Sequence, residues 1–213
     1  MVTPNVDHIV QLETNKELQD VYANASLILT DGKPLLWIAK WYGTPIKEKI
    51  SGSDLFPLLC DMAAKKGYRM YFLGAAEGVA AKAAENLAKR YNGLQVVGTY
   101  STPYGFEKNP EEMDKIKGMI KEANPHILIV GLGCPKQEKF MYHHCEELGV
   151  PISFGLGASF DFEAGNIKRA PRWMADHGLE WLFRITQDPK RMAKRYLVDD
   201  RKILGLAIKY RKR

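Results

Sequence analysis

Four segments of the chain combine glycine with polar side chains in patterns suited to binding phosphate or moving a proton. They are residues 29–32 (LTDG), 72–78 (FLGAAEG), 130–138 (VGLGCPKQE) and 154–161 (FGLGASFD). Glycine lets a backbone approach a phosphate closely, and the N-terminus of a following helix supplies unpaired N–H donors. Because three such glycine loops follow apolar runs, we expect a phosphate-bearing ligand near Gly74 and Gly133.

Two common nucleotide sites do not match these loops. The loop at Gly74 has the spacing G-x-x-x-G, and the next apolar run ends without an acidic residue for a ribose. The chain also lacks the G-x-x-x-x-G-K-[S/T] motif of P-loop proteins. The sequence therefore argues against an NAD-dependent enzyme and against a P-loop NTPase.

Asp31 is the carboxylate best placed for a chemical role. It follows the apolar run 26–30 and directly precedes Gly32. A carboxylate partly removed from water at that place would have a raised pKa and could act as a general base. Spacing alone also allows a structural role, because aspartate here can form an Asx turn or cap the helix that contains residues 34–40.

Other groups that could bind ligands are less clear. Asp161 can contact a sugar or ribose hydroxyl, or it can cap a loop. Cys134, His143, His144 and Cys145 resemble a set of soft-metal ligands, but adjacent histidines on a helix point about 100° apart and do not converge. The chain contains no Asp-x-Asp pair of the kind that holds a divalent ion. We therefore predict no metal site and no cofactor.

Short apolar runs that alternate with helical patterns must position these groups. We expect strands at residues 26–30, 69–73, 94–97, 126–130 and 151–154, and helices at 53–66, 77–91, from 110 onward and 135–148. This order is typical of an α/β protein with a mostly parallel, Rossmann-like sheet and helices on both faces. Ligands of such sheets bind beyond the carboxyl ends of the strands. We place the core at residues 1–170 and a basic helical C-terminal appendage at residues 171–213.

The composition is that of a soluble globular protein. Of the 213 residues, 46% are apolar and 26% are charged, which excludes a mainly disordered chain. No apolar run approaches the roughly 18 residues that a membrane-spanning helix needs. Three cysteines without a CxxC pair indicate reduced thiols and a cytoplasmic protein.

Positive charge is concentrated at one end of the chain. Residues 168–213 carry a net charge of +9, whereas residues 1–167 carry a net charge of −3. Drawn as one helix, residues 190–213 place most apolar side chains opposite most cations. This pattern favours contact with an anionic membrane surface. The alternative is an ordinary terminal helix packed on the core. Nucleic acid is a weaker candidate, because no recognised nucleic-acid motif accompanies the charge.

Nine short motifs are spread over essentially the whole chain. They are residues 3–5 (TPN), 30–32 (TDG), 51–54 (SGSD), 73–76 (LGAA), 131–138 (GLGCPKQE), 157–161 (GASFD), 164–165 (AG), 168–171 (KRAP) and 178–182 (GLEWL). In this order they resemble the WecG/TagA/CpsF glycosyltransferases. The resemblance implies inverting transfer of N-acetylmannosamine, or its uronic acid, from UDP to N-acetylglucosamine linked to undecaprenyl diphosphate. The product would serve teichoic acid or a related surface polysaccharide.

The same resemblance implies roles for single residues. Asp31 matches the proposed general base, Thr3 and Asn5 match a motif near the catalytic pocket, and Gln137 matches the glutamine of the Pro-Lys-Gln-Glu motif. Lys49 stands where an arginine is common in the family. It keeps the positive charge but loses the bidentate fork that suits phosphate.

Cations in the appendage complete the expected site. Without a metal, helix N-termini and cationic side chains must stabilise the charge on departing UDP, and the candidates are Arg184, Arg191 and Arg195. Alternatively, these arginines face lipid headgroups. The expected partners are a UDP-sugar donor, the undecaprenyl-diphosphate-linked acceptor and the inner face of the cell membrane, where the protein would associate peripherally. No nucleic acid is expected, and a homo-oligomer is left open.

A second function remains compatible with the sequence. Members of the family usually carry a further segment before the motif at residues 3–5, and only two residues precede it here. The alternative is therefore a non-catalytic relative that binds a UDP-sugar or phosphate and lacks that segment. Release of UDP in the presence of a lipid-diphosphate acceptor distinguishes the two functions.

Overall fold

A parallel sheet forms the centre of the molecule. The computed structural model describes residues 1–211, apart from the side chains of Arg172, Asp176 and Arg191. Its strands are β1 (Arg69–Gly74), β2 (Gln95–Tyr100), β3 (Ile127–Gly131) and β4 (Ile152–Gly155). They pair in the order β2-β1-β3-β4, and all pairs are parallel. Their carboxyl ends therefore meet at one edge of the sheet.

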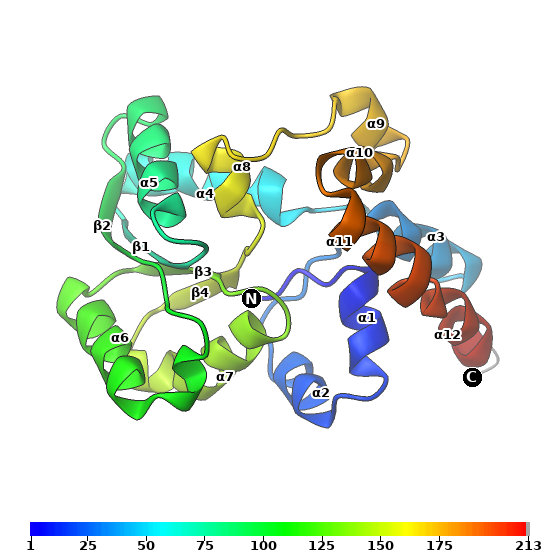
Figure 1. Cartoon of the computed structure of the whole chain (residues 1–213), viewed down its shortest axis with the longest axis horizontal. Helices are drawn as coiled ribbons and strands as arrows, with labels where there is room; N and C mark the ends of the chain where they lie inside the picture. The colour runs from blue at the N-terminus through cyan, green and yellow to red at the C-terminus, as the bar shows by residue number, and fades with distance from the viewer. Residues whose placement is uncertain (212–213) are drawn as a thin grey trace.

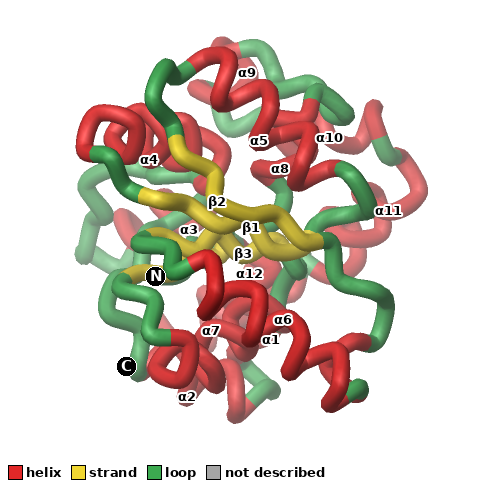
Figure 2. Tube along the Cα trace, turned by 90° about the vertical axis from the view of Figure 1, so that its left-hand side faces the viewer, coloured by secondary structure: helices red, strands yellow, loops and turns green. Residues whose placement is uncertain are grey.

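Helices cover both faces of this sheet, as Figures 1 and 2 show. One face carries α4 (Gly52–Lys66), α5 (Val79–Arg90) and α8 (Ser159–Ala164). The other carries η1 (Phe106–Lys108), α6 (Pro110–Ala123) and α7 (Lys136–Leu148). Buried side chains pack between the sheet and each layer, with Phe56, Phe72 and Phe160 in edge or tilted contact on the first face. The predicted α/β architecture is confirmed.

The N-terminal residues continue the sheet beyond β4. The amino group of Met1 donates to the carbonyl of Ser153 at 2.8 Å, and the N–H of Gly155 donates to the carbonyl of Met1 at 3.3 Å. On its other side this segment contacts residues 27–29 through the N–H groups of Val2 and Leu29. The segment at residues 1–3 thus lies between β4 and residues 27–29, and it brings Asp31 to the carboxyl edge of the sheet.

The predicted strand at residues 26–30 is wrong. Within the described residues only an isolated parallel bridge joins Ile28 to Val2. Leu27 and Ile28 are 48% and 47% exposed, so no further layer buries this segment. The N–H of Asp31 donates to the carbonyl of Pro4 at 2.8 Å, which continues the contact with the N-terminal residues, and the chain then turns at Gly32. That turn begins α3 (Lys33–Trp41).

Two N-terminal helices were not predicted. They are α1 (Val6–Leu12) and α2 (Lys16–Ala23). The side chains of Asn5 and Asn15 cap them by accepting hydrogen bonds from the N–H groups of His8 and Leu18. Asparagine is among the preferred N-cap residues, so this signal was present in the sequence.

The C-terminal part is helical, but the single amphipathic helix drawn over residues 190–213 is wrong. The segment consists of α9 (Arg172–Asp176), α10 (Glu180–Gln187), α11 (Pro189–Lys194), a π-helical turn η2 (Arg195–Asp199) and α12 (Lys202–Arg211). The N–H of Asp200 donates to the carbonyl of Arg195 at 2.8 Å, which closes the wider turn. Residues 212 and 213 of the drawn helix lie outside the described chain.

No helix of residues 1–211 is long and apolar enough to cross a membrane.

Candidate active site

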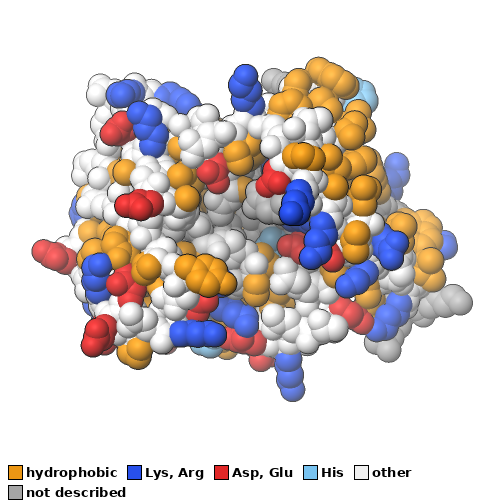
Figure 3. Space-filling model, viewed as in Figure 1, with side chains coloured by type: hydrophobic (Ala, Val, Ile, Leu, Met, Phe, Trp, Pro, Cys, Tyr) orange, Lys and Arg blue, Asp and Glu red, His pale blue; other side chains and the backbone are white. Residues whose placement is uncertain are grey.

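A cleft of about 570 Å³ opens at the carboxyl edge of the sheet, between the strand-end loops and the C-terminal helices. Figure 3 shows this face hollowed near its centre. The loops after β3 and β4 and the N-terminal segment form one side, and α10, α11 and η2 contribute the other. Eight of the predicted residues line it: Thr3, Asn5, Asp31, Gly133, Gln137, Asp161, Arg184 and Arg195.

The electrostatic surroundings of Asp31 suit a base. Removal from water raises the pKa of its carboxyl from 3.8 to about 6, and the negative charge of Glu180 adds to this rise. The positive charges of Arg184, Lys49 and His8 act in the opposite direction. Among the described residues, its carboxylate has no hydrogen-bond or ion-pair partner. It is therefore free to accept a proton from a ligand near neutral pH.

Gln137 also lines the cleft, where it packs against the backbone of Gly155 and Gly157. Its side chain is buried and its Nε2 donates to Oε1 of Glu138 at 2.7 Å, while its Oε1 has no partner. A Cβ added to Gly157 would lie 2.8 Å from that Oε1, and one on Gly155 would lie 3.0 Å from Nε2. The close approach of this amide therefore requires glycine at both positions.

Thr3 and Asn5 tie the N-terminal segment into the cleft. The hydroxyl of Thr3 donates to the carbonyl of Gly155 at 3.2 Å. Oδ1 of Asn5 caps α1, lies 2.9 Å from Nδ1 of His8, and accepts a hydrogen bond from Nη2 of Arg195 at 3.2 Å. Asn5 thus connects α1 to η2, so the C-terminal segment is anchored to the wall of the cleft.

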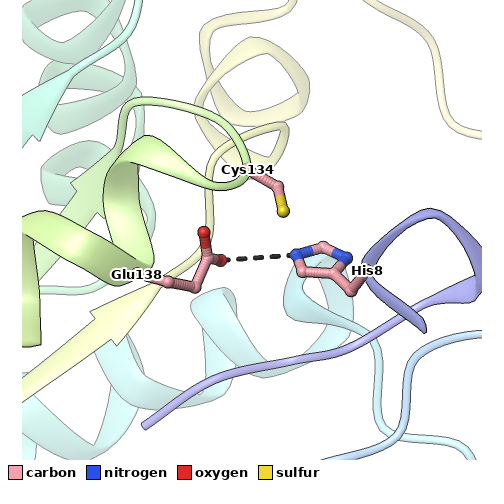
Figure 4. Close-up of side chains that lie close together, drawn as sticks. All are labelled: His8, Cys134 and Glu138. Carbon is pink, nitrogen blue, oxygen red and sulfur yellow. Dashed lines mark hydrogen bonds and ion pairs between the residues drawn. The ribbon is translucent and has the colours of Figure 1, made fainter. Parts of the chain in front are cut away.

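A group of three potential metal ligands adjoins this network. The ligand atoms of His8, Cys134 and Glu138 all lie within 4.8 Å of one another, and Figure 4 shows the three side chains pointing together. Nε2 of His8 lies 3.3 Å from Oε1 of the fully buried Glu138, whose Oε2 has no partner. This ligand set suits zinc. The described residues contain no other such group of His, Cys, Asp and Glu.

Arg184 places a cation at the rim of the cleft. Its Nη2 donates to Oε1 of Glu180 at 2.7 Å, and its guanidinium lies 5.5 Å from the ring centre of Phe162. Asp161 lies nearby on the cleft wall, where Oδ1 accepts a weak hydrogen bond from Asn166 at 3.4 Å. Helix α8, which carries Asp161, begins immediately after the glycine loop at residues 155–157.

Two predicted residues, Gly74 and Lys49, lie outside this cleft. Gly74 has a φ of +104° beneath the cleft, where an added Cβ would lie 2.5 Å from the carbonyl oxygen of Gly131. Glycine at position 74 therefore allows the ends of β1 and β3 to approach each other. The neighbouring Ala75 lines the cleft. Lys49 lines an adjoining cavity rather than this cleft. The side chain of Arg191 lies outside the described residues.

Sequence reasoning missed three polar residues of the site: His8, Glu138 and Glu180. Glu138 lies inside the Pro-Lys-Gln-Glu motif and Glu180 inside the motif at residues 178–182, so the sequence motifs contain both residues without indicating their roles. His8 completes a capping box with Asn5, a pattern that can be found from spacing. Its contact with Glu138 spans 130 positions and could not be found that way.

Comparison with known proteins identifies the family of the chain. The model of the glycosyl transferase WecG/TagA/CpsF family matches residues 1–213. The chain belongs to this family. It is 34% identical over 191 residues to an N-acetylglucosaminyldiphosphoundecaprenol N-acetyl-beta-D-mannosaminyltransferase of Bacillus spizizenii strain W23, covering 90% of this chain and 72% of that protein. A protein of the same name from Bacillus subtilis strain 168 is 32% identical over 83% of this chain and 67% of its own length.

Proposed function

We propose that this glycosyltransferase moves N-acetylmannosamine, or its uronic acid, from UDP to N-acetylglucosamine carried on undecaprenyl diphosphate. The names of the two Bacillus relatives support the sugar and the acceptor. The observation that carries the proposal is Asp31, whose unpartnered carboxylate has a pKa near 6 and faces a cleft built from glycine loops. Such a cleft suits a nucleotide diphosphate at the edge of a parallel sheet.

The reaction is a single displacement with inversion. Asp31 takes the proton from a hydroxyl of the acceptor sugar, and the resulting oxygen attacks the anomeric carbon of the donor. The bond between that carbon and the β-phosphate oxygen of UDP breaks, and UDP leaves with the bonding electrons. Negative charge then grows on the diphosphate. The guanidinium groups of Arg184 and Arg195, which line the cleft, stabilise it.

The proposed reaction does not use a metal. The chain has no Asp-x-Asp pair, and cations already line the cleft where the diphosphate would lie. If zinc bound at His8, Cys134 and Glu138, it would act as a Lewis acid beside the cleft. Oε1 of Glu138 accepts a hydrogen bond from Gln137 and also lies 3.3 Å from Nε2 of His8. These contacts support a structural role for this carboxylate.

Peripheral contact with an anionic membrane is part of the proposal. Large apolar side chains are exposed over α3 and the C-terminal helices: Trp37, Trp41, Trp173, Trp181, Leu182, Leu197, Val198, Leu204 and Ile208. Figure 3 shows orange hydrophobic groups gathered at this end with lysine and arginine among them. Exposed tryptophan and leucine beside cations are typical of surfaces that lie on headgroups. The tryptophans of α3 extend this surface beyond the predicted tail.

Release of UDP tests the catalytic part of the proposal. The purified protein is incubated with UDP-N-acetylmannosamine and a lipid-diphosphate N-acetylglucosamine acceptor, and UDP and the disaccharide lipid are measured. UDP-N-acetylmannosaminuronic acid in a parallel reaction identifies the donor sugar. Acceptor-dependent release is expected with one of the two. Tight binding of UDP without any release would contradict the proposal and favour a non-catalytic binding protein.

Vesicle sedimentation tests the membrane part. Ile208 and Leu58 are 62% and 64% exposed, but Ile208 lies on α12 within the apolar surface and Leu58 lies on α4. Ile208→Glu should weaken binding to vesicles that contain phosphatidylglycerol, and Leu58→Glu should not. Equal binding of both variants and the unchanged protein would contradict the membrane assignment.

A further inference from the structure

A second cavity adjoins the cleft at Asp31. It has a volume of about 390 Å³ and lies between the start of α3, α10 and residues 195–204. Figure 1 shows these three elements grouped at one end of the molecule. Asn5, Asp31, Arg184 and Arg195 line both cavities. The candidate base therefore stands where two separate binding spaces meet.

We propose that this second cavity, the acceptor groove, binds the diphosphate and the first lipid units of the acceptor. The groove is defined by Lys49, Arg184, Arg201, Trp181, Leu197 and Leu204. The larger cleft at the strand ends then holds the UDP-sugar. This assignment rests on the proposed function and adds the place and the chemistry of acceptor recognition.

The lining of the groove has the charge that a diphosphate needs. The groove contains five cationic side chains, Lys33, Lys49, Arg184, Arg195 and Arg201, and three carboxylates, Asp31, Glu180 and Asp200. The side chain of Lys49 is only 15% exposed, and its Nζ lies 3.7 Å from Oε2 of Glu180. Glu180 also accepts a hydrogen bond from Arg184, and Oδ2 of Asp54 lies 4.0 Å from Nζ of Lys49, so two carboxylates face these two cations. The remaining positive charge complements an anion.

Arg195 adds an unfilled donor to this lining. Its Nη2 donates to Asn5 at 3.2 Å, whereas its Nε is buried without a hydrogen bond. Oδ2 of Asp200 lies 3.8 Å from that Nε, too far for a hydrogen bond. A buried guanidinium N–H without an acceptor is costly. Because this Nε is shielded from solvent, a phosphate oxygen in the groove supplies the missing acceptor only if the side chain of Arg195 shifts toward it.

The outer end of the groove is apolar and open. Trp181, Leu197 and Leu204 line it and are 37%, 58% and 67% exposed. They belong to the apolar surface assigned to the membrane. A ligand with a diphosphate joined to a hydrocarbon chain matches both ends of the groove, with its chain directed toward the lipid. A nucleotide would fill only the charged end and leave the apolar end without contacts.

The junction position of Asp31 fits this arrangement. The acceptor sugar is joined to the diphosphate, so it would lie between the charged end of the groove and the donor in the cleft. Asp31, on the wall common to both cavities, can then remove the proton from the attacking hydroxyl. Each substrate reaches the carboxylate from its own side.

Substitution of Lys49 tests the charged end, with Lys47 as the matched control. Lys47 is two positions away and exposed, and it lines neither cavity. Lys49→Met should raise the KM for a short-chain lipid-diphosphate acceptor by about 10- to 100-fold, the effect of losing one charge-assisted contact. The dissociation constant of UDP, measured by calorimetry, should stay within about twofold. Lys47→Met should change neither quantity.

An acceptor with one phosphate provides a second readout. In the unchanged protein the diphosphate acceptor should be preferred to the monophosphate acceptor, and Lys49→Met should reduce that preference. Lys49→Arg, which keeps the charge, should restore it. A loss of fold would instead affect UDP binding and both acceptors alike.

Leu204 and Ile208 test the apolar end. Both side chains are exposed on α12, but only Leu204 lines the groove. In solution with the short-chain acceptor and without vesicles, Leu204→Glu should raise the acceptor KM, whereas Ile208→Glu should not. Equal effects of these two variants would overturn the assignment.

Direct binding separates failure of the groove from failure of the proposed function. Calorimetry with the short-chain diphosphate acceptor is carried out on the same variants. Acceptor binding that Lys49→Met and Leu204→Glu weaken, without turnover by the unchanged protein, would support the groove and contradict catalysis. If the unchanged protein turns over normally and neither variant alters that turnover, the acceptor groove is contradicted but the proposed function is not. Weaker vesicle binding by Lys49→Met at unchanged acceptor KM would assign the charge to membrane headgroups and overturn the proposal.

Discussion

Replacing Asp31 by asparagine is expected to lower the rate of transfer strongly and to stabilise the folded protein. Burial raises the pKa of this carboxyl from 3.8 to about 6. A difference of about two pKa units corresponds to about 3 kcal/mol of differential stability. The pKa of Asp31 is higher in the folded state than in the unfolded state, so protonation of Asp31 favours folding. This contribution to the free energy of unfolding is fully present below about pH 4. It is lost as the pH rises through 6, so ionised Asp31 destabilises the fold at neutral pH.

Unfolding in urea measures this effect at two pH values. At about pH 7.5, Asp31→Asn should raise the free energy of unfolding by up to about 3 kcal/mol, because the neutral amide avoids the cost of burying a charge. For a chain of this size, each kcal/mol corresponds to about 2–4 °C in Tm. Near pH 4 the gain should be small. Turnover should fall about 10²- to 10⁴-fold, the usual contribution of a general base, with UDP binding nearly intact.

Asp20→Asn is the matched control, because Asp20 is exposed on α2 and lines neither cavity. It should change the free energy of unfolding by no more than about 0.5 kcal/mol and leave turnover unaltered. An equal gain for Asp31→Asn at both pH values would show that charge is not its cause. Unchanged turnover with saturating acceptor would remove Asp31 from the mechanism.

Three shorter predictions concern the groups around this carboxylate. Glu180→Gln removes a negative charge that raises the pKa of Asp31, so the acid limb of kcat/KM should move to lower pH; an unmoved limb would refute the coupling. Activity should survive EDTA, whereas loss and recovery with Zn²⁺ would point to His8, Cys134 and Glu138. Gly157→Ala should weaken UDP binding, because its Cβ would lie 2.8 Å from Gln137; Gly118→Ala on α6 has open space and should bind UDP normally.

The central sheet could be predicted because its strands are recognisable without their neighbours. β1 and β3 are short, almost wholly buried runs, and the helices beside them end at Gly67 and Asn124 with left-handed backbone. The segment at residues 26–30 is also a short apolar run, but it lies beyond β4 and pairs with the N-terminal residues through an isolated bridge. Periodicity does not distinguish a central strand from such an edge.

Residues of the candidate site could be predicted where one sequence motif contains both the polar residue and the loop that positions it. Asp31, Gly133 and Gln137 come from loops that end strands or begin helices, and the sheet brings those loops to one edge. The second cavity was not predictable, because α3, α10 and η2 come from distant parts of the chain. The bend at Arg195 and Asp200, which turns both side chains inward, also depends on contacts with Asn5 and Asp7 that no local pattern contains.

We propose two separate uses for the positive charge of the C-terminal part. Arg184 and Arg195 are directed inward, toward Glu180 and Asn5, and line both cavities. Lys202 and Lys209 are exposed on α12, beside the apolar surface. Salt screens exposed charges over about 8–10 Å at 0.1–0.15 M ionic strength but screens partly buried pairs much less. Rising salt should thus release the protein from anionic vesicles before it weakens turnover on a short-chain acceptor. Parallel loss of both would mean that one set of cations serves membrane and substrate together.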